Sequence, residues 1–374
     1  MYDPEKMKEE YDQLEHGKTR MSGIRCAIEA ADRQNDLPFQ LYFRLELCRE
    51  STFYDDALDL FVIFPEALAL VDKHPDIPST YFDSYHKNGM THVLWVYKWV
   101  IENCIEYYQI PLADCKKFFE DYKKRSLAFG YNLKPYYLCL YDFYKHIDEE
   151  YAKQCFHKAE ALPRDRNANC RACERNGEVE YYLTYGNLEK ANNLSREIDD
   201  FTLTCGSDKS AWLRLKSNYM TYYLDRGEFE QAEAYCRMME RNLGKNYGTE
   251  YEQWEYFLYC YTHTNIGKAL KIYKEHWKEW LCQRCPQNSF DADKYICAFF
   301  QELERVRKGT TVKLNLGHTF PLYQENGQYK IAELFDFYYK RALNTAEKFD
   351  ERNGTDYYKT ELKRLLSRKG NTMD

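Results

Sequence analysis

The sequence predicts an all-α protein: an α-solenoid of repeated helical hairpins, preceded by an N-terminal helical bundle and followed by a C-terminal cap. Apolar residues recur with the 3.6-residue period of amphipathic helices along most of the 374 residues. A phrase of similar residues also returns several times in the middle of the chain. With only 16 Gly and 10 Pro, the chain has few turn residues for an all-β sandwich, which needs a turn about every ten residues.

Residues 1–78 are expected to form the N-terminal helical region. Period-3.6 patterns predict helices over Glu5–Ala31, Phe39–Arg49 and Tyr54–Val71. The stretch KHPDIPST that follows contains two prolines and lacks periodicity. We therefore place a domain boundary within it, between residues 78 and 79.

The repeated phrase predicts the solenoid, which we assign to residues 79–308. It reads EYYLTYGNLEKANNL around Gly186, NYMTYYLDRGEFEQAEAYC around Gly227 and YFLYCYTHTNIGKALKIY around Asn265. In each copy an aromatic-rich amphipathic stretch is followed by Gly or Asn and then by a second amphipathic stretch that contains an alanine. Including a fainter upstream copy, these alanines are spaced by 39, 41 and 37 residues: Ala152, Ala191, Ala232 and Ala269.

This spacing has a physical meaning. Two helices of three to four turns and a tight turn use roughly 35 to 40 residues, which is the period of helical solenoids. The Gly or Asn is expected to end the first helix with a positive φ. The alanine allows the two helices of a hairpin to approach closely.

The central copies resemble tetratricopeptide repeat (TPR) proteins. In that family a large residue, an aromatic, Gly, an aromatic and Ala recur, and here Tyr219, Tyr223, Gly227, Phe229 and Ala232 fill these places. The resemblance covers roughly residues 95 to 300, and its periods exceed the regular 34 of the family. It implies a bacterial protein with a right-handed α-solenoid, whose first helices line a concave groove that binds peptides or partner proteins.

The resemblance also implies which residues line that groove. Asn218 matches the place where peptide-binding members hold a ligand backbone or carboxylate, and Arg214 lies one turn earlier as a charge partner. A groove with Asn, Arg and aromatic walls can grip a peptide through amide hydrogen bonds and apolar pockets. The full set of expected groove residues is Tyr137, Tyr141, Asn176, Glu180, Arg214, Asn218, Trp254 and Tyr261.

Residues 309–374 are expected to cap the last repeat. Val312, Leu314 and Leu316 alternate with polar residues, and Asn326-Gly327 is a hairpin-type turn, which predicts one or two short strands. A long amphipathic helix follows and stops at Asn353-Gly354. The basic stretch after it, residues 359–369, is interpreted as a solvated helix end.

Three of the 14 cysteines have the spacing of metal ligands. Cys170 and Cys173 form a CxxC pair, and Cys205 follows 32 residues later. Zinc prefers four ligands, and thiolates two residues apart can share one ion; Asp208 is within reach as the fourth. We expect reduced, unligated thiols and no cofactor, with a zinc site as the alternative.

The remaining observations exclude classes of function. A net charge of -7 argues against nucleic acid as a partner. The chain lacks an apolar run of membrane length and begins with an acidic polar stretch in place of an export signal. We therefore expect a cytoplasmic protein with reduced cysteines and no membrane partner. HExxH, GxxxxGK[ST] and GxSxG motifs are absent.

These observations predict a non-catalytic scaffold or regulator that binds a protein or peptide. The alternative is a solenoid that carries a metal or other functional site at Cys170, Cys173 and Cys205. The sequence is compatible with both a monomer and a homodimer.

Overall fold

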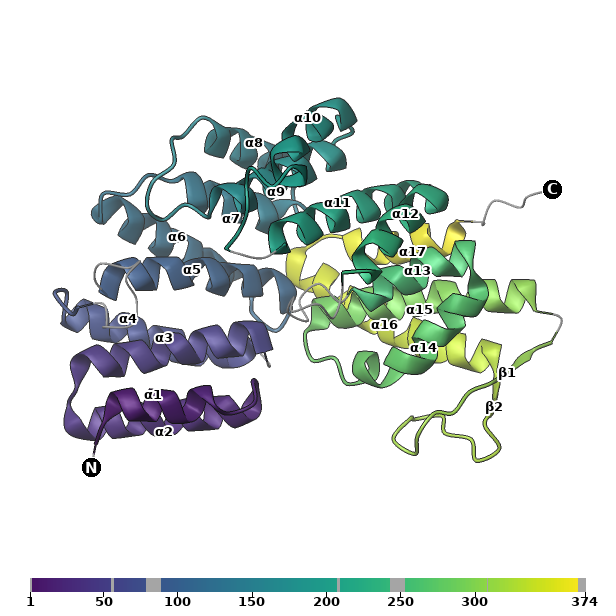
Figure 1. The fold of residues 1–374 in the computed structure, drawn as a ribbon, viewed down its shortest axis with the longest axis horizontal. Helices are drawn as coiled ribbons and strands as arrows, with labels where there is room; N and C mark the ends of the chain where they lie inside the picture. The colour runs from purple at the N-terminus through teal and green to yellow at the C-terminus, as the bar shows by residue number, and fades with distance from the viewer. Residues whose placement is uncertain are drawn as a thin grey trace. The chain divides into compact units, whose positions relative to one another are not determined.

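The computed structural model describes residues 2–54, 57–78, 89–206, 209–242, 253–307 and 309–368. The chain forms two compact units, which we describe separately. The first comprises residues 1–168, 284–287 and 352–355, and the second comprises residues 169–283, 288–351 and 356–374. Among the described residues there are 17 α-helices and one sheet of two short strands, which confirms the all-α class (Figure 1).

The first unit is built from helices that pack on their neighbours along the chain. α2 packs on α3, α3 on α4, and α7 on both α5 and α8. In none of the ranges described above does a helix combine the length and apolar character needed to cross a membrane. The helices are α1 (Pro4–Asp12), α2 (Lys18–Gln34), α3 (Leu37–Tyr54), α4 (Leu60–Lys73), α5 (Gly89–Glu106), α6 (Leu112–Ala128), α7 (Lys134–Tyr144) and α8 (Glu149–Glu160).

The N-terminal helix expected over residues 5–31 is divided into α1 and α2. Gly17 adopts a φ of +88°, which residues with a side chain rarely tolerate, and so the chain can turn there. The Gly17 amide donates to a carboxylate oxygen of buried Glu50 at 2.7 Å. Periodicity alone did not reveal the break because the apolar positions stay in register across it.

Arg352 closes the C-terminal end of α5 within the first unit. Its guanidinium donates to the carbonyl oxygens of Cys104 at 2.6 Å and Tyr107 at 3.1 Å. Carbonyls of the last helical turn point away from the helix, and a cation is favourable at this end. Arg352→Met should therefore lower the free energy of unfolding by about 1–3 kcal/mol in urea titrations. The control, Arg305→Met, removes an exposed arginine paired with Glu302 and should change the free energy of unfolding little. If both variants lose the same free energy of unfolding, the role assigned to Arg352 is wrong.

The second unit consists mainly of helix pairs and a small sheet. α9 packs on α10, α11 on α12 and α13 on α14, while α9 also packs on α11. Its elements are α9 (Arg171–Thr184), α10 (Leu188–Asp199), α11 (Ser210–Arg226), α12 (Phe229–Glu240), α13 (Trp254–Thr264), α14 (Ile266–Leu281), most of α15 (Pro286–Val306), β1 (Thr311–Lys313), β2 (Gln328–Lys330), most of α16 (Ile331–Asn353) and α17 (Tyr357–Ser367).

The turns inside the helix pairs follow the sequence pattern in two cases and depart from it in one. Gly186 and Gly227 have φ values of +78° and +75°, as expected for glycines after a helix. Asn265, however, has a φ of -158°, and its side chain caps α14 by accepting from the Lys268 amide. The expected positive φ at Asn265 is therefore wrong, because this asparagine, which follows α13 directly, also caps the start of α14 from an extended conformation.

The expected strands are present. β1 and β2 pair antiparallel, with Val312 opposite Tyr329. The turn before β2 uses Gly327 at a φ of +65°, and the Leu314 amide donates to its carbonyl at 3.0 Å. Val312, Leu314 and Leu316 are all buried in the apolar core of the second unit.

The basic stretch near the C-terminus is not a freely solvated helix end. Arg368 donates to the carbonyl oxygen of Leu224 at 2.8 Å and also to that of Asp225. Arg364 donates to the Asp225 carbonyl at 3.3 Å. These carbonyls lie in the last turn of α11, so the two arginines complement the negative end of that helix's dipole.

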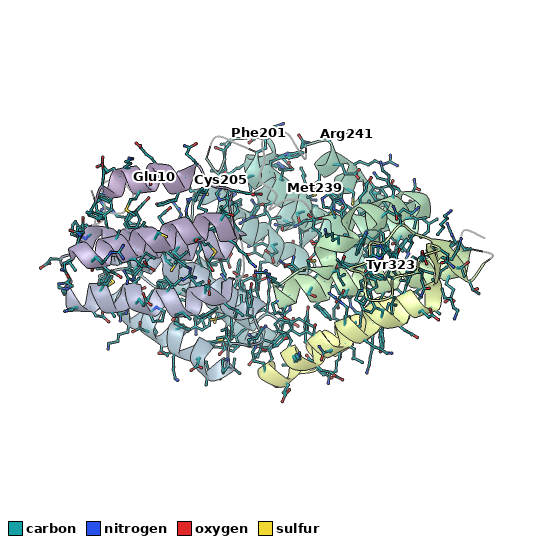
Figure 2. The ribbon with its side chains drawn as sticks, turned by 90° about the horizontal axis from the view of Figure 1, so that it is seen from below. Glu10, Phe201, Cys205, Met239, Arg241 and Tyr323 are labelled. Carbon is teal, nitrogen blue, oxygen red and sulfur yellow. The ribbon has the colours of Figure 1, made fainter. Side chains whose placement is uncertain are left out.

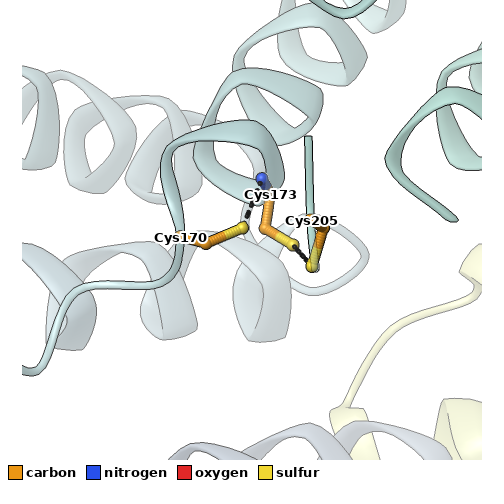
Figure 3. A group of neighbouring side chains, drawn as sticks. All are labelled: Cys170, Cys173 and Cys205. Atoms are coloured by element: carbon orange, nitrogen blue, oxygen red, sulfur yellow. Dashed lines mark hydrogen bonds between the residues drawn. The ribbon is translucent and has the colours of Figure 1, made fainter. Parts of the chain in front are cut away.

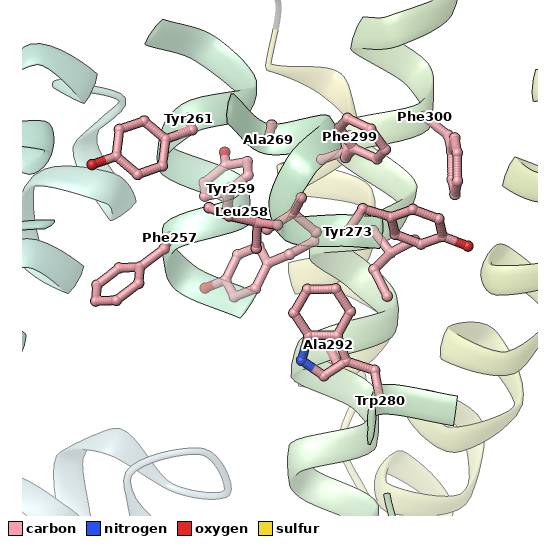
Figure 4. Packing of buried hydrophobic residues seen from close by; sticks show 14 of the residues in the cluster. Phe257, Leu258, Tyr259, Tyr261, Ala269, Tyr273, Trp280, Ala292, Phe299 and Phe300 are labelled. Carbon is pink, nitrogen blue, oxygen red and sulfur yellow. The ribbon is translucent and has the colours of Figure 1, made fainter. Parts of the chain in front are cut away.

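Most aromatic residues of the second unit lie in its core. Tyr273 is fully buried, its ring lies 5.0 Å from that of Phe300, and its hydroxyl is 3.1 Å from that of Tyr338. Tyr259 and Phe257 of α13 belong to the same cluster (Figure 4). The high tyrosine content therefore serves helix packing here.

Candidate functional site

Cys170 is positioned by the start of α9. It occupies the N-cap with an extended conformation, and its sulfur accepts a hydrogen bond from the Cys173 amide at 3.3 Å. An N-cap side chain commonly satisfies the free amides of the first turn, a role that oxygen usually fills. The CxxC spacing thus places both thiols at the first turn of one helix.

Cys205 reaches the same place from the segment that joins α10 to α11. Gly206, directly after it, has a φ of +65° and open space around its Cβ position, so glycine is needed there for backbone conformation and not for packing. The Cys173 thiol donates to the Cys205 sulfur at 3.7 Å, as Figure 3 shows. Figure 2 labels Cys205 and Phe201 of this connecting segment.

The three sulfurs are close enough to share a metal ion. No two of them are more than 4.8 Å apart. Some point therefore lies within about 2.8 Å of all three sulfurs. A small movement of the sulfurs would shorten this distance to the zinc–thiolate bond length of about 2.3 Å. Among the described residues this cluster contains no fourth ligand, and Asp208 lies outside them.

The protonation of the cluster is uneven. Burial raises the pKa of Cys170, but hydrogen bonds from the Cys173 amide and from the neighbouring thiols outweigh it, so its pKa is lowered. Burial, reinforced by the Cys170 thiolate, raises the pKa of Cys173, and Arg214 acts against this rise. Burial also raises the pKa of Cys205. Among the three cysteines of the cluster, Cys170 is therefore the thiol that ionises most readily.

Two of the eight expected groove residues lie in the first unit. Tyr137 is half-buried, with the Lys158 ammonium 5.6 Å from its ring centre. Tyr141 is buried and packs edge-on against Phe156. The other six belong to the second unit.

The two asparagines connect α9 and α11. Asn176 is only 1% exposed, and its side-chain amide donates to the Ala211 carbonyl at 2.9 Å. Asn218 is half-buried and donates to the Asn176 carbonyl at 3.2 Å. Both side chains thus bind neighbouring backbone, and Asn176 is too buried to contact a partner directly.

The two expected groove residues on α13 also serve packing. Trp254 stacks on His276 with ring centres 4.4 Å apart. Tyr261 is buried and donates to the Glu240 carboxylate at 2.9 Å, with the Lys268 ammonium 3.8 Å from its ring centre. The repeat register identifies the helix that carries each residue, but not which of its neighbours cover it.

The structure places four of the eight expected groove residues on α9 and α11, close to the cysteine cluster. Cys173, Asn176 and Glu180 recur at three- and four-residue spacing on α9, so they lie along one face. Arg214 on α11 is exposed, and its charge acts on the Cys173 thiol. The sequence contains this signal, since the cysteine and asparagine positions share the helical period.

Two other features are less informative. A pocket of about 330 Å³ in the first unit is lined by Lys18, Arg25, Asp59 and Arg284, among others. Sequence reasoning missed it because Arg284 is distant along the chain. In the second CxxC pair, Cys282 is exposed at the end of α14, while the buried Cys285 thiol donates to the Glu106 carboxylate at 3.6 Å.

Comparison of the chain with protein-family models, with curated proteins and with solved structures gave no match.

Proposed function

We propose that this chain is a TPR-like helical-repeat protein, a right-handed α-solenoid of the bacterial cytoplasm, and that it binds a protein or peptide without catalysis. The packing of α9 on α10, α11 on α12 and α13 on α14 supports the repeat, as does the packing of α9 on α11. The repeat alanines Ala191, Ala232 and Ala269 are fully buried. Each allows close approach of helices, as the repeat pattern requires.

The binding face that we propose lies on α9 and α11 and consists of Glu180, Arg214 and Asn218. The observation that carries it is that Arg214 is exposed, on the same helix face as half-buried Asn218 and beside the helix that carries Glu180. An arginine next to an amide suits the carboxylate and backbone groups of an extended peptide. Asn176, Tyr141, Trp254 and Tyr261 support helix packing in this proposal. The partner is thus a peptide segment with an acidic group.

Selection from a displayed random-peptide library, followed by calorimetry on the selected peptides, tests this face. Arg214→Glu should weaken binding about 10- to 100-fold, the loss expected for one hydrogen bond to a charged group plus repulsion. Asn218→Ala should weaken it about tenfold. Circular dichroism should stay unchanged for both variants.

The matched control is Arg226→Glu, because Arg226 is an exposed arginine at the end of the same helix, paired with Glu228. It should leave binding unchanged. Peptides that bind all three variants as tightly as the wild type would place the site elsewhere, and a library that yields no binders would refute the proposed function.

A second candidate function is zinc binding at Cys170, Cys173 and Cys205. The observation that favours it is the approach of all three sulfurs to within 4.8 Å of one another. Thiolate ligands in a near-tetrahedral arrangement suit zinc. The two functions are compatible, because none of the three thiols belongs to the proposed binding face, although Cys173 shares α9 with Glu180.

A further inference from the structure

The cysteine cluster joins two segments of the second unit that are distant along the chain. Cys170 and Cys173 begin α9, whereas Cys205 lies before α11. A ligand held by all three sulfurs would close the loop of chain between them, which includes the whole of α10. Closing such a loop removes conformational freedom from the unfolded chain, and the stabilisation grows with loop length.

The segment that leads to Cys205 contains two left-handed residues, one just after the C-cap of α10 and one directly after Cys205. Phe201 has a φ of +60°, which costs a residue with a side chain about 1–2 kcal/mol. Its side chain is 46% exposed, so burial in the core does not compensate. Gly206 is left-handed as well.

We infer that Cys170, Cys173 and Cys205 bind one zinc ion that fastens residues 201–206 to the start of α9, and so orders the two helices of the binding face. The regulatory part of this inference rests on the proposed function, whereas the ion does not. On binding, each thiol releases its proton to solvent and each sulfur donates an electron pair to zinc. A water molecule takes the fourth position, and no oxidation state changes.

Geometry and charge both favour zinc. In a tetrahedron with zinc–sulfur bonds of about 2.3 Å, the sulfurs are about 3.8 Å apart, and the Cys173–Cys205 distance is 3.7 Å. Three thiolates around a divalent ion leave one net negative charge. Arg214, whose charge acts on Cys173, offsets it. Arg214 thereby connects the ion to the proposed peptide face.

The first test measures the ion without any partner. The full-length protein, purified under reducing conditions, should contain about one zinc ion per chain by elemental analysis. After chelation and addition of Co²⁺, it should give the thiolate charge-transfer and visible bands of a tetrahedral cobalt site. Cys173→Ser and Cys205→Ser should lose both signals. Cys282→Ser, which removes an exposed thiol of the same unit, should keep them.

A second measurement on the wild type covers variants that fail to fold. Zinc should slow the alkylation of Cys170, Cys173 and Cys205 by at least about tenfold, as mass spectrometry of the labelled peptides reports, while Cys282 reacts at the same rate with and without zinc. Reduced wild-type protein that takes up neither zinc nor cobalt overturns the inference. The inference is also overturned if zinc slows the alkylation of Cys282 as much as that of the other three cysteines.

The last test concerns regulation. Chelation should increase amide hydrogen exchange at residues 201–206 and in the first turn of α9, and should weaken binding of the selected peptides about tenfold. Zinc binding with unchanged exchange and unchanged peptide affinity overturns the fastening role. Peptide binding without zinc binding would refute this inference alone. Zinc binding with the exchange effect but without peptide binding would refute the proposed function alone.

Discussion

Tyr273→Ala should lower the free energy of unfolding of the second unit by about 3–5 kcal/mol. The tyrosine is fully buried between α15 and α16, and its ring contacts Phe299 and Phe300. Alanine removes the ring and leaves a cavity that the surrounding helices cannot fill completely. It also leaves the Tyr338 hydroxyl, which is 3.1 Å from that of Tyr273, without this partner.

Urea unfolding followed by tryptophan fluorescence measures this effect, because Trp277 and Trp280 belong to the same core. Tyr273→Phe is the matched control. It keeps the ring and removes only the hydroxyl, so it should cost about 1–2 kcal/mol. If alanine and phenylalanine destabilise the protein equally, the packing role assigned to the ring is wrong.

The helices could be predicted from the sequence because their signals are local. The apolar period marks the helices, and Gly186 and Gly227 mark helix ends within a few residues of where they occur. Asn265 shows the limit of such signals. An asparagine between two helices can end the first in a left-handed conformation or cap the second from an extended one, and only the neighbouring contacts decide.

Contacts between distant segments could not be predicted. Buried Asp293 accepts from Arg341 at 3.0 Å, and both residues looked like ordinary surface charges in the sequence. Arg352, far along the chain from α5, closes the end of that helix. A periodic pattern identifies the buried face of a helix but not the residue that covers it. For the same reason Tyr141 and Tyr261 were expected in a groove and are buried.

The candidate site combines local and distant signals. The CxxC spacing of Cys170 and Cys173 is local and was recognised as metal-like. The approach of Cys205 depends on the backbone at Gly206, which one sequence cannot specify. The adjacency of Arg214 to the Cys173 thiol, and of Asn218 to Asn176, required the packing of α9 on α11. It is this adjacency that connects the two alternatives that the sequence left separate.

Acid should destabilise the second unit through His263. Both ring nitrogens are buried and have no hydrogen-bond partner among the described residues, and the ring stacks on Phe229 with centres 3.9 Å apart. Burial lowers the pKa of His263 to about 4; Glu302 opposes this shift, while Arg305 and Arg368 add to it. The folded state therefore keeps a neutral imidazole at pH values where the unfolded chain is protonated.

The direction of the pH effect follows from this difference. Below an unfolded pKa of about 6.5 the unfolded state binds a proton that the folded state does not. Stability is thus fully present above pH 6.5 and falls as the pH drops toward 4, by up to about 3 kcal/mol.

Unfolding free energies at pH 7, 6, 5 and 4 should fall more steeply for the wild type than for His263→Phe, which cannot be protonated. Acidic groups elsewhere affect both proteins equally, so the difference between the two curves reports His263. His157→Gln, at an exposed histidine of α8 beside Glu160, should follow the wild-type curve. Parallel curves for the wild type and His263→Phe would mean that water reaches the imidazole and solvates its charged form.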